Sequence, residues 1–153
     1  MKKVTFSFIF WLCVSIVAFS QNDKLIIGKW NFVDMLPSDA QRAKMKPTPE
    51  QEAQRVAMMK KMAEKSYYEF GNGTITILMD MGFGAPKPIA STWTFEDKGK
   101  TTIFIKGASS ASEGGSKQKT QDAKFKIEKI SQNELVLVSL EEKSKGTKMI
   151  LKK

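Results

Sequence analysis

Two pairs of carboxylates are the side chains most suited to catalysis in this chain: Glu69 with Asp80, and Glu96 with Asp97. Paired carboxyl groups that face each other across a cleft can act as acid and base, as they do in glycoside hydrolysis. The hairpin predicted around Glu69 places it and Asp80 on a polar, outward face, where Asp80 lies nearer to Lys65. Glu96 and Asp97 border a predicted turn. Neither pair is placed in a cleft, so we expect that the protein is not an enzyme.

Other catalytic and metal-binding side chains are scarce. The 153 residues include no His and a single Cys, Cys13. Without imidazole there is no Ser-His-Asp or Cys-His catalysis and no His-ligated metal site. The acidic residues do not cluster as the ligands of a calcium-binding loop. We therefore expect no metal ion and no other cofactor.

The excess of basic residues raises the question of a nucleic-acid or membrane-surface partner. The chain has 25 Lys and Arg residues against 16 Asp and Glu, a formal net charge of +9. The lysines are spread over every predicted element, and only Arg42 and Arg55 supply guanidinium groups. No strand combines a basic stripe with interleaved aromatic residues. A solvated basic surface is the better interpretation, and we expect no nucleic-acid partner.

Residues 1–20 have the layout of a secretory signal peptide. The segment starts with Lys2 and Lys3 and continues with an apolar run over residues 4–19. The small residues Ala18 and Ser20 suit cleavage after Ser20. The apolar run is short for a transmembrane helix. We expect a secreted or periplasmic domain over residues 21–153 with no stable membrane span after signal removal. A signal that stays attached as an anchor is the alternative.

The segment after the signal peptide begins with strand-like alternation. Residues 24–34 are predicted as the first strand, with Trp30 and Phe32 on one side. Residues 35–46 carry Pro37 and few apolar side chains, which indicates a crossing loop. This loop leads toward the one predicted helix.

The helix begins with three agreeing signals. In Thr48-Pro49-Glu50-Gln51, the Thr can cap, the Pro suits the first helical position, and the Gln can complete a capping box. The helix is predicted over about 49–65. Its apolar stripe consists of Ala53, Val56, Ala57 or Met59, and Ala63. The helix is expected to pack across the mouth of the fold with the methionines of this region, and an adaptable surface for partners is the alternative. These methionines are Met45, Met58, Met59 and Met62.

A hairpin follows the helix, because the hydrophobic period changes to two from Ser66 onward. Asn72-Gly73 is a strong two-residue turn signal. This turn sets the following pairs: Phe70 opposite Ile75, and Tyr68 opposite Ile77. Opposed residues share a face, so this register puts the large apolar side chains on one side of the sheet.

A second hairpin is predicted over residues 89–96 and 101–106. Its turn is expected to have three residues, Asp97-Lys98-Gly99, with Gly99 in the left-handed conformation. The expected pairs are Trp93 with Ile103, Ser91 with Ile105, and Glu96 with Lys100. The connection before it, which contains Met79 to Pro88, reads as a turn-rich link, with a mobile lid over the barrel mouth as the alternative.

The remaining segments complete eight strands. Residues 107–120 are a low-complexity loop, residues 123–130 and 135–140 form a third hairpin, and residues 147–151 form the last strand. Eight meandering strands can close into a barrel or form a sandwich. Near-continuous hairpins favour the barrel. The prediction is a mostly β fold: an eight-stranded antiparallel up-and-down barrel with one helix between strands one and two.

The segment Leu25–Phe32, with sequence LIIGKWNF, resembles the Gly-x-Trp opening of the lipocalins, in the short form of bacterial secreted lipocalin-like proteins. Supporting segments are Tyr68–Thr74, Ser91–Phe95 and Ile127–Val138. The resemblance implies that Gly28 lets the strand bend and that Trp30 plugs one end of the barrel. It also implies a basic side chain packed on that Trp, for which Lys148 or Lys152 is available in place of the family's Arg.

The candidate binding residues are aromatic and aliphatic side chains expected on the inner face of the barrel. They are Trp30, Phe32, Tyr68, Phe70, Ile77, Trp93 and Phe95. In a small barrel such side chains either line a ligand cavity or simply fill the interior.

Two functions follow from these alternatives. The first is a noncatalytic lipocalin-like protein, secreted or periplasmic, that binds a small hydrophobic or amphipathic ligand. The second is an envelope-associated module with a solid core that binds a protein partner through the Met-bearing helix or the loop over residues 107–120.

Overall fold

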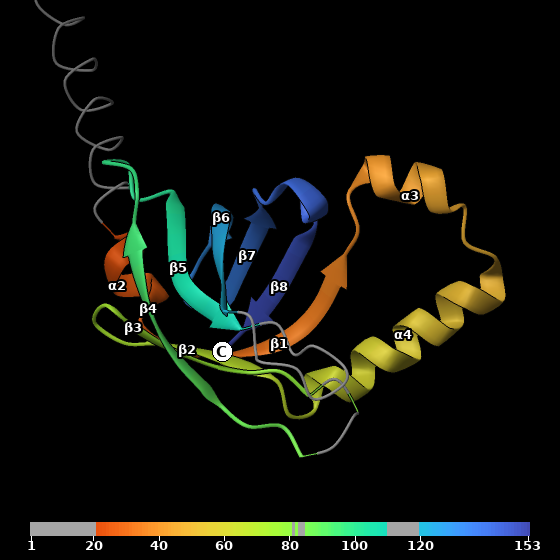
Figure 1. Ribbon diagram of the computed structural model, residues 1–153, viewed down its shortest axis with the longest axis horizontal. Helices are drawn as coiled ribbons and strands as arrows, with labels where there is room; N and C mark the ends of the chain where they lie inside the picture. Colours follow the sequence, from red (N-terminus) through yellow and green to blue (C-terminus); the bar gives the residue numbers. More distant parts are fainter. Residues whose placement is uncertain (1–20, 81, 83–84, 110–119) are drawn as a thin grey trace, which may run out of the picture.

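The strands of this chain close into one antiparallel barrel, as the computed structural model in Figure 1 shows. The structure describes residues 21–80, 82, 85–109 and 120–153. The strands follow one another around the barrel in chain order, and the eighth pairs with the first. The predicted up-and-down barrel is therefore confirmed, as is a helix between its first two strands.

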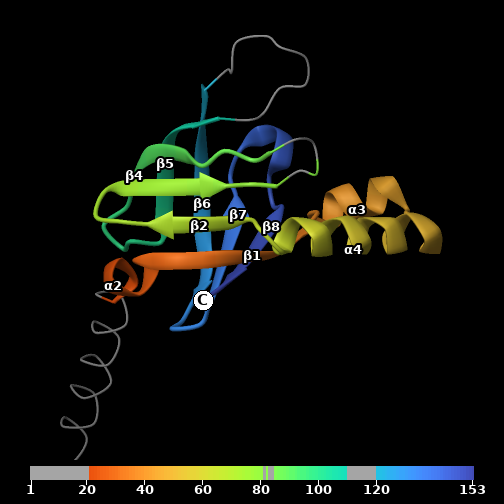
Figure 2. The same cartoon turned by 90° about the horizontal axis from the view of Figure 1, so that it is seen from below.

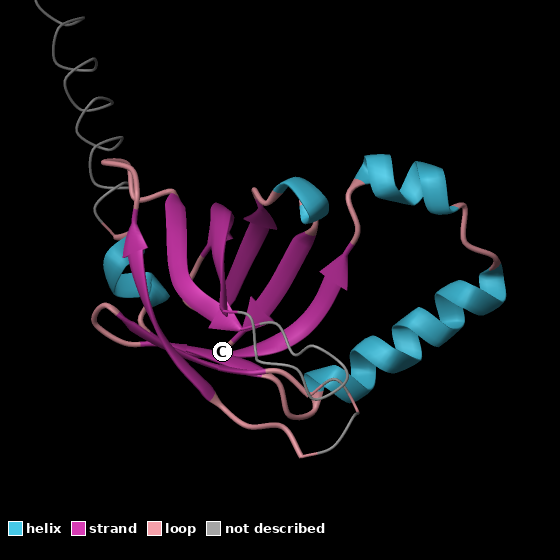
Figure 3. Ribbon diagram, viewed as in Figure 1, coloured by secondary structure: helices cyan, strands magenta, loops and turns pink. Residues whose placement is uncertain are grey.

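The elements alternate short strands with a few helices (Figure 3). The strands are β1 (Gly28–Leu36), β2 (Tyr67–Phe70), β3 (Thr74–Leu78), β4 (Ile89–Phe95), β5 (Thr102–Ser109), β6 (Thr120–Ile130), β7 (Glu134–Ser139) and β8 (Lys148–Lys152). The helices are α2 (Asn22–Ile26), α3 (Asp39–Met45), α4 (Pro49–Ala63) and a 3₁₀ turn over Glu142–Ser144. None of the helices in the described part of the chain is long and apolar enough to cross a membrane.

Three of the predictions fall partly or wholly outside the described residues. They are the signal peptide over residues 1–20, most of the loop over residues 107–120, and Met81, Phe83 and Gly84 of the link before β4. At the described margins, β5 extends to Ser109 and β6 begins at Thr120, so both strands are longer than predicted.

The β2–β3 hairpin has the predicted register. Tyr68 pairs with Ile77 and Phe70 with Ile75. The amide of Gly71 donates to the carbonyl of Thr74 at 2.7 Å, and Gly73 takes φ +76°, which glycine tolerates without strain. Local turn chemistry and the hydrophobic pattern agree here, so the register is set without help from the rest of the barrel.

The β4–β5 register differs from the prediction by two residues. Trp93 pairs with Ile105, not Ile103, and Phe95 takes Ile103. The cause is Asp97, whose carboxylate accepts hydrogen bonds from the amides of Thr101 and Thr102 and so holds a longer loop. The left-handed residue is Lys100, with φ 52°, not Gly99. A two-residue shift keeps the same faces, so Trp93 and its neighbours still point inward.

The expected charge pair across that turn is also wrong. Lys100 donates to the carboxylate of Asp23 at 2.6 Å, whereas Glu96 pairs with Lys124 on β6 at 2.5 Å. The longer loop carries Lys100 away from Glu96 and toward α2. This ion pair therefore joins the β4–β5 turn to the N-terminal helix.

The first strand is shorter than predicted, because residues 24–26 belong to α2. Ile26 is fully buried, and the strand begins only at Gly28. In this helix Ile26 packs into the core cluster at the end of the barrel. The predicted crossing loop over residues 35–46 likewise contains α3, which begins with a capping box between Ser38 and Gln41.

Helix α4 begins at the predicted capping box of Thr48 and Gln51, and it ends at Ala63, two residues early. The predicted apolar stripe is only partly correct. Met59 and Ala63 pack against the core, but Val56 is 53% exposed. Only the C-terminal part of α4 packs on the core, and Figure 2 shows α3 and α4 projecting from the barrel. The predicted packing of all the methionines across the mouth is therefore wrong: Met62 is buried, but Met45 and Met58 are exposed.

Arg55 fixes the projecting helix to β1. Its guanidinium donates to Asp34 at 3.1 Å and to the carbonyl of Met35 at 3.2 Å. It also donates to Glu52, and this hydrogen bond holds the pKa of the Glu52 carboxyl below its usual value. A polar clamp therefore sets the angle of α4 where apolar contacts are few.

We expect replacement of Asp97 by Ala to lower the free energy of unfolding by about 1–2 kcal/mol at neutral pH, because the Thr101 and Thr102 amides lose a charged acceptor. Partial burial raises the pKa of the Asp97 carboxyl, but the hydrogen bonds from Thr101 and Thr102 together outweigh burial and leave this pKa below its usual value. The stabilisation should therefore be complete above the unfolded-state pKa and disappear as the pH falls through the folded-state pKa.

Urea unfolding of D97A at neutral and strongly acidic pH measures this effect. The matched control is Glu96→Ala, which removes only a partly exposed ion pair and should change stability little. An equal loss in both variants would show that Asp97 does not hold the turn.

Candidate functional site

The two ends of the barrel are built differently. One end of the barrel holds α2, the β2–β3 turn, the start of β1 and the end of β8. At the other end the strands lead into α3, α4 and the longer connections. We call the first the α2 end and the second the mouth. The seven predicted binding residues all face the interior and contribute to one core cluster, in which Phe95 is only partly buried.

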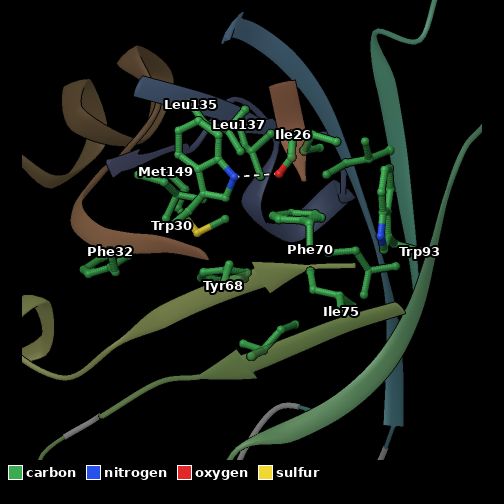
Figure 4. Packing of buried hydrophobic residues seen from close by; sticks show 14 of the residues in the cluster. Ile26, Trp30, Phe32, Tyr68, Phe70, Ile75, Trp93, Leu135, Leu137 and Met149 are labelled. Carbon is green, nitrogen blue, oxygen red and sulfur yellow. Dashed lines mark hydrogen bonds between the residues drawn. The ribbon is translucent and has the colours of Figure 1, made fainter. Parts of the chain in front are cut away.

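Trp30 is the central side chain at the α2 end (Figure 4). It is fully buried, and its indole Nε1 donates to the carbonyl of Ile26 at 2.7 Å. Gly28, between them, takes φ +118°, a conformation that L side chains rarely adopt. The sharp change of direction between α2 and β1 therefore depends on a glycine and an indole hydrogen bond.

A basic side chain does pack on Trp30, but it is neither Lys148 nor Lys152. Lys153 places its Nζ 4.5 Å from the indole ring centroid and donates to the carbonyls of Leu25 and Ile27 at 3.2 and 3.3 Å. The last residue of the chain thus holds the end of α2 against the barrel. Lys153 directly follows Lys152 in the sequence. A basic partner for Trp30 was therefore predicted correctly, but at the wrong lysine.

Three aromatic rings fill the interior next to Trp30. Phe70 and Trp93 meet edge to face with centroids 5.3 Å apart, and Trp93 and Phe95 do so at 5.1 Å. The indole of Trp93 donates to the carbonyl of Gly71 at 3.0 Å. These residues hold one another in place, so this half of the barrel is packed by its own side chains.

The other three predicted residues, Phe32, Tyr68 and Ile77, are buried in the same core cluster, and Tyr68 pairs with Trp30 on β1 and with Ile77 on β3. Met149 on β8 belongs to the same cluster. Among inner-facing strand residues whose side chains the structure describes, none is Lys, Arg, Asp or Glu. The lysines and acids of the strands lie on the outer face, as Lys29 does over the ring of Tyr67 at 4.1 Å. The described inner-facing side chains of the strands therefore carry no charge.

Among Phe32, Tyr68 and Ile77, only Tyr68 carries a polar group, its hydroxyl. Its side chain is buried, and its hydroxyl has no hydrogen-bond partner among the described residues. Burial raises the pKa of the Tyr68 hydroxyl to about 12, so it stays a neutral donor at physiological pH.

An open depression of about 630 Å³ lies at the α2 end, outside the packed core. It is bordered by α2, the β2–β3 turn and β4. Trp93 and Phe95 reach it, and Asp23, Lys24 and Asn72 contribute its polar groups. Two of the predicted residues therefore border space that opens at this end and not at the mouth.

The carboxylate pairs do not form a site. Glu69 is exposed on the outer face, and Asp80 lies 3.8 Å from Lys65. Glu96 is engaged with Lys124, and Asp97 with its own turn. Within the described segments, no group of three or more His, Cys, Asp or Glu side chains is arranged to hold a metal ion.

Two solved structures resemble this one. A lipocalin-like protein from Bacteroides uniformis superposes with a TM-score of 0.51 at 18% identity, over 84% of this chain and 97% of that one. An uncharacterized protein from Bacteroides eggerthii gives a TM-score of 0.50 at 17% identity, over 83% and 98%. At this identity the similarity shows a shared fold, the lipocalin-like barrel. No family model and no curated protein matches the sequence.

We expect replacement of Lys153 by Met to destabilise the α2 end by about 0.5–1 kcal/mol, because it removes a cation over an indole and two bonds to helix-end carbonyls. Hydrogen exchange of the α2 amides should accelerate. The matched control is Lys152→Met on the exposed face of β8, which should leave these amides protected. Equal exchange in the two variants would contradict the role of Lys153.

Proposed function

We propose that the protein is a noncatalytic binder of a small apolar or amphipathic molecule, held at the α2 end of the barrel. The observation that carries this proposal is the open depression of about 630 Å³ at the α2 end. Ile27, Trp93 and Phe95 give it apolar surface, and Asp23, Lys24 and Asn72 give it polar groups. The lipocalin-like fold supports the proposal, because closed barrels of this size can hold one small ligand.

The energetics set the size of such a ligand. Burying one methylene group contributes about 0.8 kcal/mol, and micromolar affinity needs about 8 kcal/mol. A ligand must therefore bury about ten methylene groups or an equivalent ring system, and more once the entropy lost on association is counted. A compact lipid-like molecule meets this requirement, whereas a small metabolite does not.

We also propose that the protein acts outside the cytoplasm. The signal-peptide pattern over residues 1–20 supports export to the periplasm or the medium, and the absence of Cys from residues 21–153 is compatible with it. N-terminal sequencing of the protein from the producing cells tests this. A sequence starting at Gln21 is expected, and a chain that keeps residues 1–20 would contradict cleavage.

Native mass spectrometry tests the binding proposal directly. The protein is purified without detergent, and its mass is measured before and after organic extraction. We expect a stoichiometric adduct of a few hundred daltons that extraction removes. A mass without adduct, unchanged by a panel of fatty acids, long-chain ketones, sterol-like molecules and haem, would contradict ligand binding.

The projecting helices favour a second candidate function, binding to a protein of the cell envelope. Met45, Val56 and Met58 are at least half exposed on α3 and α4, although all three are apolar. A photo-crosslinking residue placed at position 58 should then capture one defined partner in intact cells. The same residue placed at Lys126, on the exposed face of β6, is the control and should not.

A further inference from the structure

We infer that the molecule bound at the α2 end is an amphipathic anion, whose head group pairs with Lys24 and whose apolar part lies against Ile27 and Phe95. This inference rests on the proposed function, which leaves the charge of the ligand open. It adds the chemical class of the ligand and the side chain that selects it.

The depression at the α2 end lies between segments that are far apart in the sequence. Figure 1 shows α2 beside β4 and the β2–β3 turn, and these three segments and the residue that follows α2 line the depression. Its volume of about 630 Å³ is within the range of small-molecule sites. The depression is open, so a ligand can reach it while the packed core stays closed.

The apolar surface of the depression suits a hydrocarbon chain. Ile27 is 40% exposed, and Phe95 is only partly buried beside the ring of Trp93. The indole N–H of Trp93 donates to the carbonyl of Gly71, so Trp93 offers a ligand its ring and no hydrogen bond. A chain that covers Ile27 and Phe95 removes apolar surface of both from water, which favours binding.

The charged groups at the depression favour an anion. Asp23 and Lys24 both line it, but Asp23 already accepts a hydrogen bond from the ammonium group of Lys100 at 2.6 Å. This hydrogen bond holds the pKa of the Asp23 carboxyl below its usual value, so the carboxylate is ionised and paired at neutral pH. Lys24 is exposed and forms no ion pair with any residue that the structure describes. Two ammonium groups against one carboxylate leave a net positive charge for the ligand to meet.

The other polar side chains that line the depression are neutral. They are Asn72 and Thr94, and both are exposed. The amide of Asn72 can donate to a carboxylate oxygen, but it supplies no charge. Discrimination between an anion and a neutral molecule of equal length therefore depends on Lys24.

Three probes that differ only in their head groups test the inference. Decanoic acid, decan-1-ol and decylamine have carbon chains of equal length and are anionic, neutral and cationic at neutral pH. Each is used below its critical micelle concentration. Dissociation constants are measured by titration calorimetry at low and at high salt, and unfolding in urea confirms that each variant folds.

The variants Lys24→Met and Lys24→Glu are compared with a matched control, Lys60→Met. Lys60 is likewise exposed and forms no ion pair among the described residues, but it lies on α4 at the mouth. K24M and K60M therefore remove the same charge from opposite ends of the barrel. A further variant, Ile27→Ser, removes exposed apolar surface from the depression.

We expect the wild-type protein to bind the acid about three- to tenfold more tightly than the alcohol, and K24M to lose this preference while its affinity for the alcohol stays unchanged. High salt should weaken binding of the acid to the wild type much more than to K24M, because salt screens exposed charge pairs. K24E should prefer the amine to the acid. K60M should match the wild type with every probe, which separates Lys24 from the net charge of the chain.

The outcomes separate the inference from the proposed function. I27S should bind the acid and the alcohol more weakly by the same factor, because both lay the same chain on Ile27. If K24M keeps the preference for the acid, or if the wild type binds the alcohol or the amine as tightly as the acid, the inference is overturned; weaker binding by I27S would then leave the proposed function standing. Failure of the wild type to bind any probe, together with the absence of an adduct in native mass spectrometry, would overturn both.

Discussion

The hydrogen bond from the Trp30 indole to the carbonyl of Ile26 is the constraint on which the barrel depends. It turns the chain from α2 into β1 at Gly28 and places α2 across one end. Lys153 then holds the same helix from the last residue of the chain, so the first and last described elements meet at this indole. A barrel needs both edge strands aligned to close, and this contact aligns β1 with the end of β8.

The two ends of the barrel are held by different interactions. At the α2 end, each buried indole N–H has a carbonyl partner, and the rings pack edge to face, so little there can move without cost. At the mouth, the guanidinium of Arg55 holds α4 to β1 through Asp34 and the carbonyl of Met35. The α2 end is therefore fixed by indoles and packed rings, and the mouth by a charged clamp.

The sequence predicts those parts of the fold that local chemistry determines. Asn72-Gly73 and the two-residue alternation fix the β2–β3 register, and the capping box of Thr48 fixes the start of α4. The β4–β5 register was missed because a side chain, Asp97, and not a glycine, sets that turn. Helix α2 was missed because its helical state depends on packing against the barrel end, which no local pattern encodes. The seven interior residues follow from strand alternation, which a two-residue register error preserves; which of them border open space depends on three-dimensional packing.

The described interior contains several buried polar groups, and all but one serve the fold. Ser66 Oγ accepts the amide of Asp80 at 2.8 Å, and Ser139 shares a hydrogen bond of 2.6 Å with Ser144, so both hydroxyls fix connections at the mouth. The indoles fix the opposite end. Tyr68 does neither, and its ring alone would fill the same volume. A buried hydroxyl without a partner costs stability, so Tyr68 departs from the pairing that the other buried donors of the described interior keep.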